Sequence, residues 1–101
     1  MQVVTIDAKG RALQRVVHLS GRAHEELMWV ALGNGGPWEV TFDKDSAGSP
    51  FSQATYIVPR GGPVHTTGGP AAGTAGNTYK YNVRNANTHA ITDDPDVDID
   101  P

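Results

Sequence analysis

Short runs in which apolar and polar residues alternate recur along this chain. Segments 38–42 and 79–83 each carry three large apolar residues separated by polar ones. Because successive side chains of a strand point to opposite faces, each segment has one face suited to burial. The same reasoning predicts further strands at residues 3–6, 13–19, 51–58 and 96–100, with a brief pairing at 88–91. The side chains that we expect to point inward are Val17, Leu19, Trp38, Val40, Phe42, Tyr79, Tyr81, Val83, Val97 and Ile99.

Segment 20–33 fits two kinds of element. Residues 23–28 include good helix formers, with Ser20 as a possible N-cap and Gly33 as a possible end. Residues 27–32 also form a short apolar block before a glycine, which suits a strand buried on both faces. The surrounding strands favour the second interpretation. The turn-forming sequence at 33–37 then predicts a hairpin between 27–32 and 38–42.

The remaining landmarks are a long loop and an acidic end. Residues 59–77 hold six glycines and three prolines and have little to bury, so we expect a flexible loop. The last nine residues carry five aspartates and no base. We expect an acidic C-terminal strand within 93–101, whose repeated carboxylates discourage pairing at a sheet edge. About seven short strands in one domain, residues 1–101, predict an all-β sandwich or a partly open barrel.

Composition removes several classes of function. The chain has no cysteine, which excludes disulfides, thiolate nucleophiles and cysteine-ligated metals. The net charge of −3 and the acidic end give no basic surface for nucleic acid. The longest apolar run, 27–32, is far too short to span a membrane, and residues 1–7 do not look like a signal peptide. We therefore expect a cytoplasmic protein, unless the chain is a mature fragment of an exported one.

The order of the strand motifs resembles that of a known class of sandwich. Trp38-x-Val40-x-Phe42, a later Ser-Pro-Phe at 49–51, Tyr79-x-Tyr81-x-Val83 and the closing Asp-Pro-Asp-Val at 94–97 together resemble small bacterial domains of the cupredoxin-like class. The resemblance covers about residues 27–100 and implies a Greek-key β-sandwich. It does not imply electron transfer, because Val83 stands where a copper-binding member has its cysteine.

No catalytic or metal-binding motif is complete. The four histidines, at 18, 24, 65 and 89, are never spaced as a local metal clip. His24-Glu25-Glu26 begins a zinc-protease motif, but Met28 stands at the second histidine. The aspartates after 93 resemble a calcium loop without its central glycine and distal glutamate. We therefore predict no catalytic residue, no metal and no cofactor.

The favoured hypothesis is a non-catalytic binding domain, because a rigid sheet that carries one long loop is a common arrangement for recognition. Its partner would be another protein or a second copy of itself, with no nucleic acid or membrane involved. The candidate binding residues lie in the 59–77 loop: Arg60, His65, Thr66 and Thr67. Two alternatives stay open, a metal-binding or vestigial redox domain and a small enzyme. A pocket lined by at least two titratable groups would favour the enzyme.

Overall fold

In a computed structural model, the chain folds into β-strands joined by loops, and no helix occurs in the part described, residues 1–42, 47–61 and 66–101. The all-β prediction is confirmed, and the ambiguous segment is a strand. Eight strands are present: β1 (Gln2–Ile6), β2 (Val16–Ser20), β3 (Leu27–Ala31), β4 (Trp38–Phe42), β5 (Thr55–Val58), β6 (Thr78–Asn85), β7 (Ile91–Asp93) and β8 (Asp96–Asp100).

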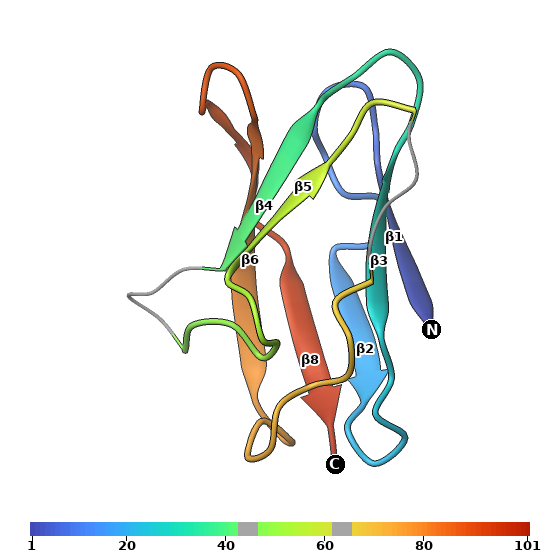
Figure 1. The fold of residues 1–101 in the computed structure, drawn as a ribbon, viewed down its shortest axis with the longest axis vertical. Helices are drawn as coiled ribbons and strands as arrows, with labels where there is room; N and C mark the ends of the chain where they lie inside the picture. The colour runs from blue at the N-terminus through green and yellow to red at the C-terminus, as the bar shows by residue number, and fades with distance from the viewer. Residues whose placement is uncertain (43–46, 62–65) are drawn as a thin grey trace.

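The strands form two sheets that curl toward each other (Figure 1). β1 and β3 make a small parallel sheet. The larger sheet has the order β2-β8-β6-β4-β5, and β7 pairs with the far end of β6. At the margins, β1 approaches β2 and β3 approaches β5. The two sheets therefore enclose one core between them, as a partly open barrel would.

The core is filled by the inward positions that the alternating pattern predicted. All ten side chains predicted to point inward are buried, together with Val4, Ile6, Leu27 and Trp29 from the small sheet. Five aromatic rings meet at the centre, with neighbouring centroids 5.4 to 6.4 Å apart, and most of these pairs are edge-on or tilted. Aromatic pairs at such distances add about 0.5–1.5 kcal/mol each beyond the area that they bury.

The predicted hairpin between 27–32 and 38–42 is wrong. β3 pairs in parallel with β1, and β4 lies between β5 and β6. The glycine-rich connection instead carries the chain from the small sheet to the large one. It passes so close to the turn after β1 that a Cβ on Gly35 would lie 2.7 Å from the Cα of Ala8. A close approach of this kind requires glycine.

Two strands begin later than the pattern predicted. Segment 13–19 is strand only from Val16, because the chain before it crosses β1 through a bridge between Ile6 and Ala12. Segment 51–58 is strand only from Thr55. Ser49 turns the preceding residues, since its hydroxyl accepts from the backbone N–H of Phe51 and donates to the carbonyl of Gln53.

The acidic C-terminal strand is not at an edge, so the edge-protection interpretation is wrong. β8 lies between β2, to which it is parallel, and β6, to which it is antiparallel. Val97 and Ile99 point into the core as predicted. Asp93 belongs to the separate strand β7, which replaces the brief pairing expected at 88–91. Within the described residues, no helix is long and apolar enough to cross a membrane.

Candidate functional site

The loop residues predicted to bind a partner are engaged within the protein. Arg60 donates from Nη2 to the carbonyl of Gly36 at 2.6 Å. Thr66 donates from Oγ1 to a carboxylate oxygen of Glu26 at 2.8 Å. His65 lies outside the described residues. Arg60 and Thr66 therefore help to hold the loop against the two sheets.

Thr67 is the clearest structural residue of this group. Its side chain is buried, its backbone N–H donates to the carbonyl of Leu27 at 2.9 Å, and its Oγ1 accepts from the N–H of Leu27 at 3.1 Å. Thr74 is buried further along the loop. The expectation that this loop has little to bury is therefore wrong, since both threonines pack into the fold.

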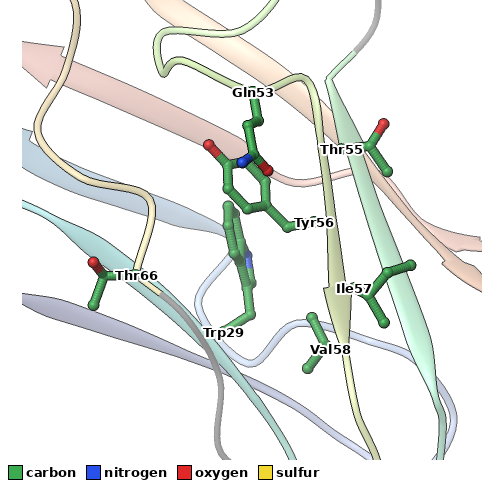
Figure 2. A pocket seen from close by; sticks show the side chains of 7 residues that line it. All are labelled: Trp29, Gln53, Thr55, Tyr56, Ile57, Val58 and Thr66. Atoms are coloured by element: carbon green, nitrogen blue, oxygen red, sulfur yellow. The ribbon is translucent and has the colours of Figure 1, made fainter.

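A groove lies where the margin of β3 faces β5 (Figure 2). It has a volume of about 270 Å³ and is lined by Trp29, Gln53, Thr55, Tyr56, Ile57, Val58 and Thr66. The rings of Trp29 and Tyr56 lie 5.5 Å apart beside it. Tyr56 is its only titratable lining residue among those described, and burial raises the pKa of that phenol. The groove therefore does not meet the criterion of two titratable groups that an enzyme would satisfy.

Several buried polar atoms near this groove have no hydrogen-bond partner among the described residues. They include Nε1 of Trp29 and the hydroxyl oxygens of Tyr56 and Tyr81. Burial raises the pKa of Tyr81 far above that of a free phenol. The indole N–H of Trp29 lies near enough to oppose this rise without making a well-formed hydrogen bond. Tyr81 is therefore a neutral core residue and has no role in proton transfer.

The outward carboxylates of β8 are balanced by neighbouring strands. Nδ1 of His18 lies 3.6 Å from Asp98 and 3.5 Å from Asp100. Lys80 lies 3.2 Å from Asp96, and Thr78 donates to Asp98 at 2.6 Å. Nowhere in the described part of the chain do three or more metal-binding side chains group as an ion would require. The acidic strand thus forms a network of surface ion pairs.

The outer face of the small sheet is the most unusual surface of the described chain. In β1 and β3, alternate residues are buried, so Val3, Met28 and Val30 point away from the core. Leu13 joins them because its N–H donates to the carbonyl of Thr5, next to the bridge that buries Ala12. Leu32 continues the row beyond β3 and is exposed. We call these five residues, Val3, Leu13, Met28, Val30 and Leu32, the apolar face.

This face is open to solvent. The exposed fraction of Leu13 is 57%, Val3 and Leu32 are also exposed, and Met28 and Val30 are half-buried. A sheet face in water normally carries polar side chains, as the outer faces of β8 and β6 do here. Clustered apolar residues of this kind mark interaction surfaces.

The sequence did hold a signal for this face. The unbroken apolar block 27–32 was interpreted as a strand buried on both sides, whereas the protein buries only one side of it. The second apolar side therefore has no covering element of its own. Comparison of the chain with protein-family models, with curated proteins and with solved structures finds no match.

Proposed function

We propose that this chain is a non-catalytic binding domain whose apolar face packs against another protein chain. The single observation that carries the proposal is the exposure of apolar side chains on the outer side of β1 and β3. Complete burial of an aliphatic side chain is worth about 1.5–3 kcal/mol. Several partly exposed ones together can therefore support a protein interface after the cost of association is met.

The engagement of the loop residues supports moving the site away from the 59–77 loop. Arg60, Thr66 and Thr67 spend their hydrogen-bonding groups on the protein itself. The apolar face has no such internal role, because its side chains point away from the core. It also lies on regular strands, which hold a binding surface in a fixed shape.

We also propose that the fold is a cupredoxin-like Greek-key sandwich without the copper site. The aromatic pattern of β6 and the closing strand β8 beside it support this assignment. Val83 is fully buried, and its hydrocarbon side chain has no atom that binds copper. One equivalent of Cu(II) added to ¹⁵N-labelled protein should leave the amide signals around Val83 in place. Selective broadening there at stoichiometric metal would refute the copper-free assignment.

The binding proposal is tested by site-specific photo-cross-linking. The photoreactive residue p-benzoylphenylalanine replaces Leu13 in one variant and Ile91 in a matched control. Ile91, in β7 of the larger sheet, has an exposed fraction of 63%, close to the 57% of Leu13. Circular dichroism first confirms that both variants fold.

After irradiation in an extract of the source cells, discrete protein adducts should form from position 13 and not from position 91. Equal yields from the two positions, or no adduct from position 13, would refute the proposal.

A further inference from the structure

We propose that the partner is a second copy of this chain, with the two apolar faces packed against each other around a twofold axis. This inference rests on the proposed function and adds the identity of the partner. Two sheets that pack face to face bury one side of each, as in a β-sandwich. A twofold arrangement presents the same patch on both subunits, so the patch has to be compatible with itself.

The apolar face meets that condition. None of its five members is charged, and Thr5 is the polar residue that lies among them. Packing the face against its own copy therefore brings no like charges together at the centre. The cross-interface contacts are aliphatic on both sides, because Val, Leu and Met would meet Val, Leu and Met.

The two ends of the face carry opposite charges, which fixes the direction of packing. Glu25 and Glu26 immediately precede β3, where β1 also begins, with Arg22 further back in the turn. The turn after β1 carries the exposed side chains of Lys9 and Arg11 at the opposite end. If the strands of the two copies run in opposite directions, the acidic end of each copy lies over the basic end of the other.

The size of the face sets the strength of this dimer. Three chain segments about 4.8 Å apart and roughly five residues long give a projected area on the order of 250 Å². A stable complex buries about 800 Å² on each partner. We therefore expect weak association, with a dissociation constant between about 10 µM and 1 mM.

Sedimentation equilibrium over this concentration range tests the inference. The unmodified chain should shift from monomer to dimer with rising concentration. Leu13→Glu introduces a charge into each copy of the face and should weaken the dimer at least tenfold. Ile91→Glu adds the same charge to an equally exposed site on the larger sheet and should leave association unchanged. Thermal melts of both variants confirm that they are folded.

A charge swap tests the twofold arrangement. In low salt, Lys9→Glu and Glu26→Lys should each weaken association about threefold to tenfold, and the double variant should return to near the original value. Opposed strands place these two positions across the interface from each other. If the double variant is weaker than either single one, the proposed direction of packing is wrong.

The experiment separates this inference from the function on which it rests. A chain that stays monomeric at 1 mM refutes self-association, and so does a dimer that Leu13→Glu and Ile91→Glu affect equally. In either case, photo-adducts from position 13 whose mass differs from twice that of the chain would leave the binding function standing with a different partner. Failure of the position-13 adducts themselves would refute both.

Discussion

Asp93 is the carboxylate that joins the segment before β2 to β7. Its side chain is only 4% exposed. One oxygen, Oδ2, accepts from the N–H of Ala12 at 2.8 Å and from the guanidinium of Arg15, and the other accepts from the N–H of Asp94 at 2.9 Å. Asp93→Ala removes all of these acceptors while leaving the strands themselves unchanged.

The cost follows from what each partner loses. Ala12 is buried, so its N–H would be left without an acceptor, at about 1–3 kcal/mol. Arg15 is 52% exposed and would return to water, so its contribution is at most about 1 kcal/mol. We expect Asp93→Ala to lower the free energy of unfolding by about 2–4 kcal/mol. Asp93→Asn keeps one acceptor oxygen and should cost about 1–2 kcal/mol.

The effect of pH has a defined sign. Burial raises the pKa of Asp93, but the hydrogen bonds from Arg15, Ala12 and Asp94 outweigh it, so the pKa lies below the ordinary value. A carboxyl group with a lowered pKa contributes stability that is complete above the unfolded-state pKa, about 4, and is lost as the pH falls through the folded-state value. The difference between the unmodified protein and Asp93→Asn should therefore shrink as the pH falls from about 5 to about 2.

Urea unfolding followed by tryptophan fluorescence measures both effects, because Trp29 and Trp38 are buried. Asp94→Ala is the matched control: its neighbouring side chain is 63% exposed and lies 3.9 Å from Lys80, so it should cost no more than about 0.5 kcal/mol. The reasoning is wrong if Asp93→Ala costs no more than Asp94→Ala. It is also wrong if Asp93→Asn is equally destabilised at pH 7 and pH 2.

Three further substitutions test other parts of the fold by the same urea assay. Thr67→Val should cost about 1–2 kcal/mol, because the N–H of Leu27 loses its acceptor; an unchanged midpoint would contradict this. Tyr81→Phe should change stability by less than about 0.5 kcal/mol, since the lost hydroxyl has no partner, and a cost above about 1.5 kcal/mol would show that it has one. The hydrogen bond from Arg84 holds the pKa of Glu39 below its ordinary value, so Glu39→Gln should cost about 1 kcal/mol at pH 7 and little at pH 3. A cost for this variant that does not depend on pH would exclude the ion pair as its cause.

The sequence was informative about which side chains are buried. Strict alternation in β4, β6 and β8 fixes one face of each strand, and large apolar residues at those positions leave no other stable orientation. It was less informative about which strands are neighbours. The parallel pairing of β1 with β3 depends on the shape of the whole core, and no local turn encodes it.

The candidate site was missed for a related physical reason. Val3 and Leu13 are ordinary apolar residues in ordinary strand patterns, and their exposure appears only when the sheet to which they belong is known to have two strands with one open side. Conversely, Thr66 and Thr67 looked available because a loop rich in glycine gives no indication of which of its hydroxyls are used internally.

The pairing of β2 with β8 also governs how the chain reaches this structure. β2 has β8 as its only hydrogen-bonded neighbour among the described strands, and Val16 is paired with Asp96 near the opposite end of the chain. A ribosome would therefore complete most of the polypeptide before β2 could find its place. High contact order of this kind typically gives folding times of milliseconds to seconds. Stopped-flow refolding should accordingly be slow for a chain of this size.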